Sequence, residues 1–341
     1  MHYVGIDLHK KTLVVAVEDD HGPVGRTRRF QCEDESAIVK AFRGLRPFRA
    51  VIEASSSYRW LYALLEPLGE VILAHPLRLR AIVAARAKTD KLDAALLAQL
   101  LRADLVPEAY VPPQPYQVLR EVTRTWARLG RRATRAKNQM HAVLQSRNLH
   151  SPYRDAFCKS GRRWMARQDL GIGGNLRRDE LLRRLDHFER ERLVVDDHLA
   201  MLADEFPQIE ALLDLYGIGP YSALLIVAEL GEVDRFGDAR QVGAYAGLTP
   251  RVHQSGERAW HGQITKQGSR WLRWILVQAA IKIVRKDRAL GNLYRRVRRR
   301  SGKKRARVAV ARKLAGICWV RLRAWHRAHA GEAAAEAVAA H

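Results

Sequence analysis

The chain has 341 residues, of which 47% are hydrophobic and 28% charged, a balance typical of a globular protein of two or three domains. Its 60 lysines and arginines exceed its 36 aspartates and glutamates, giving a formal net charge of +24. No apolar run reaches the ~20 residues of a membrane span. The three cysteines (Cys32, Cys158 and Cys318) are too few and too widely spaced for a disulfide framework. Composition therefore indicates a cytoplasmic protein, with no membrane association and with a polyanion as partner.

The basic residues are concentrated in two stretches of the chain. From 281 to 327 there are 18 lysines and arginines and a single acid, Asp287. Residues 116–149 hold eight basic residues against Glu121 alone. Charge runs of this kind are often only solvated helix faces. Two of them with almost no acids favour nucleic-acid binding, because like charges repel unless phosphates neutralise them.

The first hundred residues predict a mixed α/β layer. Short apolar runs at 3–7, 12–17, 50–54 and 71–74 read as strands, with a further strand near 26–31. Helical patterns at 35–45, 58–68 and 93–101 alternate with them. Strands that alternate with helices in this way indicate an α/β domain.

Four acids stand out from this pattern. Asp7 and Glu53 each end an apolar strand, where carboxyl ends of strands border a crevice, and Asp90 and Asp93 share one helix face at spacing i, i+3. Hard carboxylate oxygens suit Mg²⁺ or Mn²⁺, which stabilise both oxygens of a phosphoryl displacement. Taken singly, Asp90 also reads as an N-cap and Asp93 as a first-turn acid, so chemistry alone leaves the metal site and ordinary helix acids as alternatives.

The middle of the chain predicts a basic helical bridge. Pro112, Pro113 and Pro115 close the first domain. One long helix then covers about 116–147, with its apolar stripe against a partner helix and its arginines left to solvent or phosphate. Residues 151–175 read as irregular, and 179–205 as a charged helix that pairs antiparallel with the first. A structural coiled coil and direct nucleic-acid contact both fit this pattern.

The C-terminal part predicts a helical hairpin followed by a polar loop. Residues 212–230 read as two helices joined by a turn at Gly217–Pro220, the pattern of a helix-hairpin-helix, although a simple αα-hairpin fits as well. Residues 243–266 read as a loop that holds Ser255 beside Gly256, among basic side chains that would offset a phosphate. Composition alone makes Ser255 either a nucleophile or an ordinary turn serine. The basic run 295–307 follows, then an alanine-rich tail at 328–341 that we expect to be frayed.

Several motifs resemble the IS110/Piv family of insertion-sequence transposases. They are GIDLHK at Gly5–Lys10, IEAS at Ile52–Ser55, KTDKLDA at Lys88–Ala94, GLTP at Gly247–Pro250, Ser255-Gly256, and GxITKxG at Gly262–Gly268. KTDKLDA is the most specific of the N-terminal motifs. The resemblance extends to about residue 323.

This resemblance implies an α/β plus α fold in four parts. Residues 1–112 would form a RuvC-like (ribonuclease-H-like) DEDD domain, and 116–205 a basic coiled-coil linker that contributes to assembly. Residues 206–327 would form a mostly helical transposase domain with a helix-hairpin-helix and the serine loop. Residues 328–341 would form a flexible tail.

The resemblance also implies a chemistry and a set of partners. Asp7, Glu53, Asp90 and Asp93 would bind Mg²⁺, and Ser255 would attack DNA to form a phosphoserine link. The partners would be donor and target DNA and an element-encoded guide (bridge) RNA that selects sites by base pairing. A homo-oligomer, dimer or tetramer, would assemble the composite site in the cytoplasm, at the bacterial nucleoid.

Two rival interpretations remain open from the sequence. A metal-dependent Holliday-junction-type nuclease would use the four acids alone and hydrolyse DNA with water. A non-catalytic nucleic-acid-binding protein would use a decayed nuclease fold, although the intact set of four acids argues against decay. Replacing Ser255 by alanine discriminates the first rival from a serine recombinase.

Overall fold

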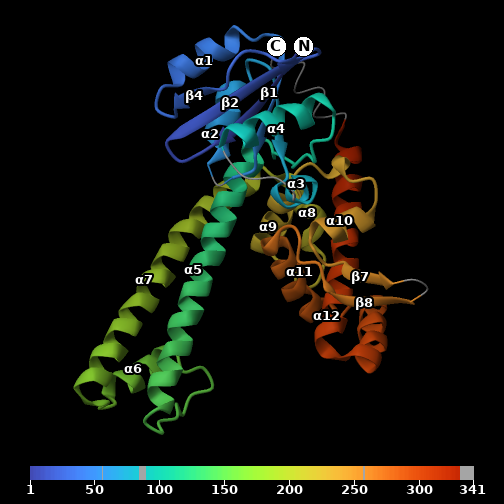
Figure 1. Ribbon diagram of the computed structural model, residues 1–341. Helices are drawn as coiled ribbons and strands as arrows, with labels where there is room; N and C mark the ends of the chain where they lie inside the picture. The colour runs from blue at the N-terminus through green and yellow to red at the C-terminus, as the bar shows by residue number, and fades with distance from the viewer. Residues whose placement is uncertain (56, 84–89, 256–257, 331–341) are drawn as a thin grey trace. The chain divides into compact units, whose positions relative to one another are not determined.

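The computed structural model describes residues 1–55, 57–83, 90–255 and 258–330, and no side chain in 83–92 or 252–261. It divides into two compact units, Met1–Val111 and Pro112–His341 (Figure 1). The boundary falls at the proline-rich stretch that begins at Pro112, where the missing amide donors interrupt regular structure. The further division of the second unit into a linker and a transposase domain stays a prediction.

The first unit is built on a mixed sheet, which in the described residues has six strands. They are β1 (His2–Leu8), β2 (Thr12–Asp19), β3 (Gly22–Pro23), β4 (Arg28–Gln31), β5 (Phe48–Glu53) and β6 (Glu70–Ala74), in the order β3-β2-β1-β5-β6 with β4 beside β2. β1 is antiparallel to β2 and parallel to β5, which is parallel to β6. The predicted mixed α/β layer is therefore confirmed.

Helices cover both faces of this sheet. Strand alternation sends Val4, Ile6 and Ile52 into one core with α1 (Glu35–Arg43) and α2 (Tyr58–Leu65). Their neighbour Val51 faces the other side, in a cluster with Leu97 of α4 (Asp90–Arg102) and Leu79 of α3 (Pro76–Val83). α4 begins at Asp90, so this residue is the first of the helix, not the residue that precedes it.

α4 lies unusually close to β1 because residue 5 is glycine. A Cβ built at Gly5 would stand 2.0 Å from the carbonyl oxygen of Ala94 and 2.5 Å from the amide nitrogen of Ala98. Both atoms belong to backbone that a side-chain rotation cannot move away. Only a residue without a side chain permits this contact between strand and helix.

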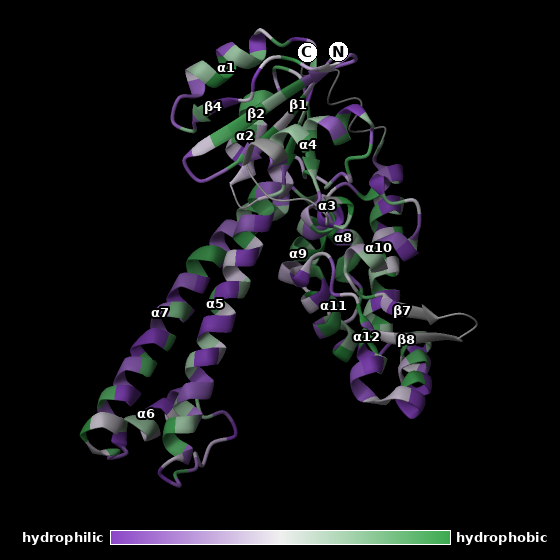
Figure 2. Ribbon diagram, viewed as in Figure 1, coloured by the Kyte–Doolittle hydropathy of each residue, from purple (hydrophilic) through white to green (hydrophobic). Residues whose placement is uncertain are grey.

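The second unit begins with two long helices. α5 (Gln114–Gln145) packs on α7 (Gly171–Asp204), and the short α6 (Lys159–Arg167) packs on α7 as well. The apolar contacts lie between the helices, and Figure 2 shows the hydrophilic residues along the remaining faces. The long helix predicted at 116–147 is confirmed. The packing of α5 and α7 as a regular coiled coil stays a prediction.

The expectation of an irregular stretch at 151–175 is confirmed for 151–158 and 168–170 and wrong for 159–167 and 171–175. α6 occupies its centre, starting after Cys158, whose sulfur accepts a hydrogen bond from the Gly161 amide at 3.3 Å. The glycines of 171–174 form the first turn of α7, which starts well before residue 179. Helical propensity is low for this glycine-rich segment. The packing of Met165 and Leu170 against α5 and α7 outweighs it.

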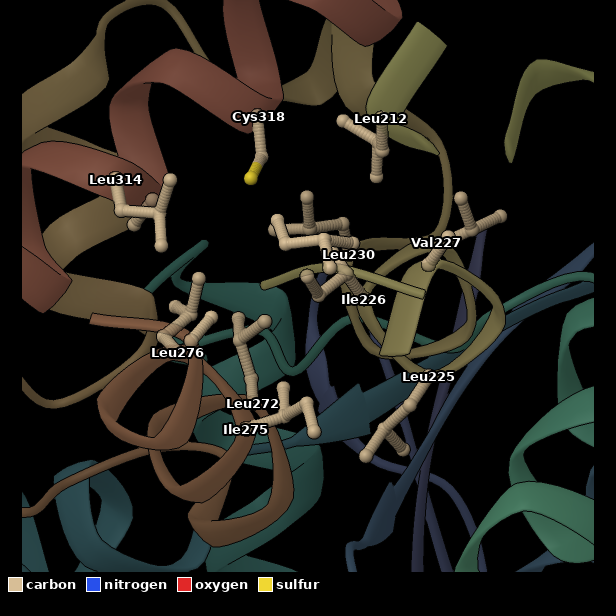
Figure 3. Packing of buried hydrophobic residues seen from close by; sticks show 14 of the residues in the cluster. Leu212, Leu225, Ile226, Val227, Leu230, Leu272, Ile275, Leu276, Leu314 and Cys318 are labelled. Carbon is tan, nitrogen blue, oxygen red and sulfur yellow. The ribbon is translucent and has the colours of Figure 1, made fainter. Parts of the chain in front are cut away.

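The rest of the second unit packs around a buried helix. Its elements are η1 (Pro207–Ile209), α8 (Glu210–Leu213), α9 (Pro220–Leu230), η2 (Val233–Arg235), α10 (Ala239–Tyr245), β7 (Pro250–Ser255), β8 (Arg258–Ile264), α11 (Arg270–Ile283) and α12 (Arg288–Ala328). α9 is buried from Ala223 to Leu230 and contacts α11, α8 and the start of α5. Figure 3 shows its leucines facing Leu272 and Leu276 of α11 and Leu314 of α12.

Two predicted features of this part change in the structure. The helix before the turn at 217–220 ends at Leu213, not Tyr216, and the name helix-hairpin-helix stays a prediction. The segment expected to be a loop at 243–266 begins in the last turn of α10 and contains an antiparallel hairpin, in which Val252 pairs with His261 and Ser255 with Arg258. Strand pairing satisfies backbone donors and acceptors that an irregular loop would leave to water.

α12 folds back on itself at Gly302. This residue has φ 79° and ψ 170°, outside the helical region and in a part of φ, ψ space that favours glycine. The kink separates a first arm (288–301) from a second arm (303–328), so the densest basic run of the sequence crosses a sharp reversal of direction. No helix in the described ranges combines the length and the apolar character of a membrane span.

We predict that Gly5→Ala lowers the free energy of unfolding of the first unit by about 3 kcal/mol, because overpacking against backbone cannot be relieved by a rotamer change. Urea unfolding monitored by circular dichroism measures this change. Gly44→Ala is the matched control, since a Cβ there meets nothing closer than 3.5 Å. Equal stability losses in the two variants would contradict the close approach of α4 to β1.

Candidate active site

Two carboxylates leave the sheet at the same end and on the same face. β1 and β5 are parallel, and Ile6 pairs with Ile52, so the next residues Asp7 and Glu53 emerge side by side from neighbouring strands. Ile6 and Ile52 point toward α1 and α2. By alternation, Asp7 and Glu53 point toward α4.

Asp93 reaches the same place from α4. It directly precedes Ala94, the residue whose carbonyl oxygen lies against Gly5. The close contact at Gly5 therefore fixes the first turns of α4 over the end of β1. Asp7, Glu53 and Asp93 together line one pocket of about 60 Å³, whose walls include Leu79 and Leu97.

Two further side chains, which no sequence motif was expected to place here, lie at the pocket or contact its acids. Arg80 of α3 lines it beside the three acids. His9 lies just outside β1 and places its Nε2 3.0 Å from Oδ2 of Asp7. A signal for His9 is present in the GIDLHK motif, two residues after Asp7. Arg80 has no such signal, because its place depends on how α3 packs after β6.

The chemistry of the donors fits a hard divalent cation. Three carboxylates around one pocket are the ligand type that Mg²⁺ and Mn²⁺ prefer, and the partly enclosing leucines would limit access of water. Among the described residues, however, no three acidic, histidine or cysteine side chains are grouped closely enough to form a metal site by themselves. The side chain of Asp90, the fourth predicted acid, lies outside the described residues.

Ser255 is the last residue of β7, and its side chain also lies outside the described residues. The base of its hairpin is held by backbone hydrogen bonds. The Thr265 amide donates to the Thr249 carbonyl at 2.9 Å, and the Lys266 amide donates to the Gly247 carbonyl at 3.2 Å. The segment that leaves β8 is therefore fastened to the segment that enters β7.

A buried ionic network lies directly behind this base. Glu229, only 1% exposed, accepts two hydrogen bonds from Arg124 at 2.7 and 2.9 Å and one from the Ser269 hydroxyl at 2.7 Å. Ser269 also accepts from the Leu272 amide and so caps α11. Burial acts to lower the pKa of the Arg124 guanidinium, but the hydrogen bonds and charge of Glu229 outweigh it and raise that pKa.

Arg120 completes the network from α5. It is 7% exposed and donates to the Ala228 and Glu229 carbonyls at 2.6 and 2.9 Å. The expectation that the arginines of this helix face solvent or phosphate is therefore wrong for Arg120 and Arg124. The C-terminal carbonyls of α9 attract cations, and this attraction draws both side chains inward. Glu229, a lone acid in the apolar run of α9, was the signal in the sequence.

Two further arginines contact an aromatic side chain. Arg131 lies over the Trp271 ring, 4.3 Å from its centroid, and Arg270 lies 4.9 Å from it. A guanidinium over an indole face is stabilised by the ring quadrupole. The contact of Arg131 ties α5 to the start of α11, the helix that follows the hairpin, and Arg270 is the neighbour of Trp271 within α11 itself.

Comparisons with known proteins identify relatives along the whole chain. Residues 209–295 match a family described as "Transposase IS116/IS110/IS902 family", and residues 4–148 match a family described as transposase, of the DEDD IS110 type. A probable family 20 transposase of Pseudomonas aeruginosa is 29% identical over 338 residues, covering 94% of this chain and 96% of its own. The transposase for insertion sequence element IS1328 of Yersinia enterocolitica is 27% identical, covering 93% and 95%. That for IS1111A of Coxiella burnetii is 25% identical, covering 94% and 89%.

We predict that Glu229→Ala lowers the free energy of unfolding of the second unit by about 2–4 kcal/mol, because it leaves the partly buried Arg124 and the Ser269 hydroxyl without their partner. Hydrogen exchange at the Thr265 and Lys266 amides should accelerate with it, since Ser269 loses its anchor. Chemical unfolding and exchange mass spectrometry measure the two effects. Glu191→Ala, an exposed glutamate on α7, serves as the control, and a similar loss in both variants would argue against the network.

Proposed function

The chain belongs to the IS110 family of insertion-sequence transposases, and from that premise we propose that it cuts and rejoins donor and target DNA through Ser255 and a carboxylate-bound divalent cation. The observation that carries the proposal is the convergence of Asp7, Glu53 and Asp93 on one pocket at the strand ends. The match of residues 209–295 to the family supports the role of the C-terminal unit. DNA is the substrate that a transposase of this family requires.

Asp7, Glu53 and Asp93, with Asp90 as the fourth ligand, would hold Mg²⁺ or Mn²⁺. Bound there, the cation would supply positive charge that stabilises the oxygens of a phosphoryl displacement. His9 holds Asp7 in place through its contact at 3.0 Å. Arg80, at the rim, is placed to contact a phosphate oxygen of the incoming strand.

Ser255 would act as the nucleophile. Its Oγ forms a bond to phosphorus while the bond from phosphorus to one deoxyribose oxygen breaks. The serine proton passes to a neighbouring base, and the departing oxygen takes up a proton. Rejoining reverses the step with the hydroxyl of another DNA end. The number of phosphate ester bonds is conserved, so neither water nor a nucleotide cofactor is consumed.

The two half-sites lie in separately compact units, which supports assembly in an oligomer. The carboxylates belong to Met1–Val111 and the serine hairpin to Pro112–His341. A homodimer or tetramer would allow a carboxylate pocket and a serine from different subunits to share one DNA strand. α5 and α7 are the elements we assign to this assembly.

Guidance by an element-encoded RNA is the remaining part of the proposal. The charge of +24 supports electrostatic binding of nucleic-acid backbones, DNA and RNA alike. Protein would hold the backbones by charge and shape, and base pairing would choose the donor and target sites.

A hydrolytic nuclease is the second candidate. One observation favours it, namely that the described pocket is formed within the first unit alone and needs no residue from the second. In that case water attacks the phosphate and Ser255 is dispensable. A non-catalytic role in nucleic-acid binding would need neither the acids nor the serine.

We predict that Ser255→Ala abolishes a covalent protein–DNA adduct and lowers strand transfer by at least ~10³-fold, because loss of a nucleophile removes the reaction path. Protein co-expressed with the flanking DNA of its element would be incubated with donor and target DNA and Mg²⁺. Denaturing gels after nuclease treatment would detect the adduct. Ser36→Ala, an exposed serine of α1, is the control. Cleavage that survives Ser255→Ala without an adduct would instead establish the nuclease.

We predict that Asp7→Asn removes cation binding while leaving the metal-free fold at least as stable, since it relieves repulsion among the carboxylates. Wild-type protein should gain about 1.4 kcal/mol when Mg²⁺ or Mn²⁺ is raised to roughly ten times its dissociation constant, and Asp7→Asn should gain none. Thermal unfolding with and without cation measures this. Asp20→Asn, at an exposed acid paired with the N-terminus, should behave as wild type. A cation-dependent gain that survives Asp7→Asn would place the ion elsewhere.

A further inference from the structure

A groove of about 930 Å³ lies between α10 and the two arms of α12, entirely within the second unit. The reversal at Gly302 creates it by bringing the arms face to face. A smaller pocket of about 650 Å³ shares Ala289, Leu293 and Arg296 with it and continues along the first arm. The two hollows therefore form one path along the most basic segment of the chain.

The rim of the groove carries an excess of positive charge, and the acids beside it, Asp238 and Asp287, cap the first turns of α10 and α12. Neither α10 nor α12 contains a single aspartate or glutamate. Arg240, Arg296, Arg312 and Lys313 line the groove, and within the described ranges none of the four forms an ion pair. Arg321, at one end, is paired with Asp214. Four uncompensated cations facing one hollow favour an anionic occupant.

The floor of the groove is apolar. It is formed by Ala289, Leu293, Ala309, Ile317 and Val320. Val320 is 55% exposed, so its side chain is accessible to an occupant of the groove. The phosphates of a duplex need no apolar surface, and its base faces are stacked inside. An unpaired strand presents both phosphates and base faces, which matches a basic rim around an apolar floor.

The groove ends at the base of the serine hairpin. Thr249 lines it, and the next residue, Pro250, begins β7, the strand that ends in Ser255. The Thr249 carbonyl is also the acceptor that fastens the exit of β8. A strand lying in the groove would therefore reach the same end of the hairpin that the Glu229 network holds rigid.

We propose that this groove binds an unpaired nucleic-acid strand, with its phosphates on Arg240, Arg296, Arg312 and Lys313 and its bases on the apolar floor. The inference rests on the proposed function in one respect. The bound strand is taken to be either DNA on which the serine hairpin acts or RNA that guides it. DNA and RNA share the chemistry the groove recognises, and the experiment separates them.

The test compares Arg296→Gln/Arg312→Gln with Arg298→Gln/Arg305→Gln. Both double variants lose two positive charges from α12, but Arg298 and Arg305 are exposed and line neither hollow. Binding of a labelled oligonucleotide of about 12 nucleotides, as single-stranded DNA, single-stranded RNA and duplex DNA, would be followed by anisotropy across salt concentrations. The binding buffer would contain EDTA, which removes divalent cations. The measured affinity would therefore depend neither on a bound metal nor on a reaction of Ser255.

The groove variant should bind single strands at least tenfold more weakly, with the slope of log affinity against log salt reduced by about 1.4, roughly 0.7 for each phosphate that is no longer neutralised. The control should stay within twofold of wild type. A loss of affinity for single-stranded DNA alone, or for single-stranded RNA alone, would support the site and identify which of the two strands it binds. Equal losses in both double variants, or an equal loss of duplex binding, would overturn the proposal.

The apolar floor has its own test in Val320→Gln. This exposed substitution should weaken single-strand binding about threefold without changing the salt slope, because it removes a contact to bases and leaves the charges in place. Val118→Gln, at a 42% exposed valine of α5, is the matched control. Circular dichroism and melting temperatures establish that each variant is folded. An unchanged affinity in Val320→Gln would reject contact between bases and the floor.

Discussion

The close approach of α4 to β1 at Gly5 is the contact on which the candidate active site depends. With 2.0 Å between a Cβ at position 5 and the Ala94 carbonyl oxygen, no other residue type allows the helix to lie this near the strand. Asp93 is the neighbour of Ala94, so this contact decides how far its carboxylate stands from the strand ends. Asp7 and Glu53 are placed by the parallel pairing of Ile6 with Ile52. The position of α4 over β1 and the register between β1 and β5 together bring Asp93, Asp7 and Glu53 to one pocket.

The second unit uses charge in two opposite ways. Arg120 and Arg124 turn inward, where Glu229 and the last carbonyls of α9 satisfy them, and the resulting network fastens α11 and the hairpin base. The arginines of α12 have no acid along their own helix, and among the described residues only Arg321 and Arg323 of them form ion pairs, with Asp214 and Asp234. The others remain available to phosphates. Both kinds come from stretches of sequence in which basic residues far outnumber acids. The difference is a single acid, Glu229, in the apolar helix against which α5 packs.

Local pattern predicted much of the first unit and little of the hairpin region. The strands near Asp7 and Glu53 are short apolar runs, and the helix after Asp90 has a clear period, so element type followed from side-chain spacing. For the glycine-rich start of α7 and for the hairpin at 250–264, the sequence pattern predicts irregular chain. Their own residues have weak preferences, and packing partners and strand pairing far along the chain stabilise them. Arg80 likewise gave no signal, since its place follows from the packing of α3.

Residue identity and side-chain spacing are enough to establish that the protein is mixed α/β and basic, and that it carries four acids and a serine in motifs of one transposase family. They also predict a domain boundary at the prolines from Pro112 on, where the structure divides into two compact units. These properties depend on composition, period and residue identity, which are local. The tertiary structure was needed to show that Asp7, Glu53 and Asp93 share a pocket, that Arg120 and Arg124 turn inward to Glu229 and the end of α9, and that α12 reverses at Gly302 to enclose a groove. Each of these depends on contacts between residues tens of positions apart, and on backbone approach distances that no local pattern specifies.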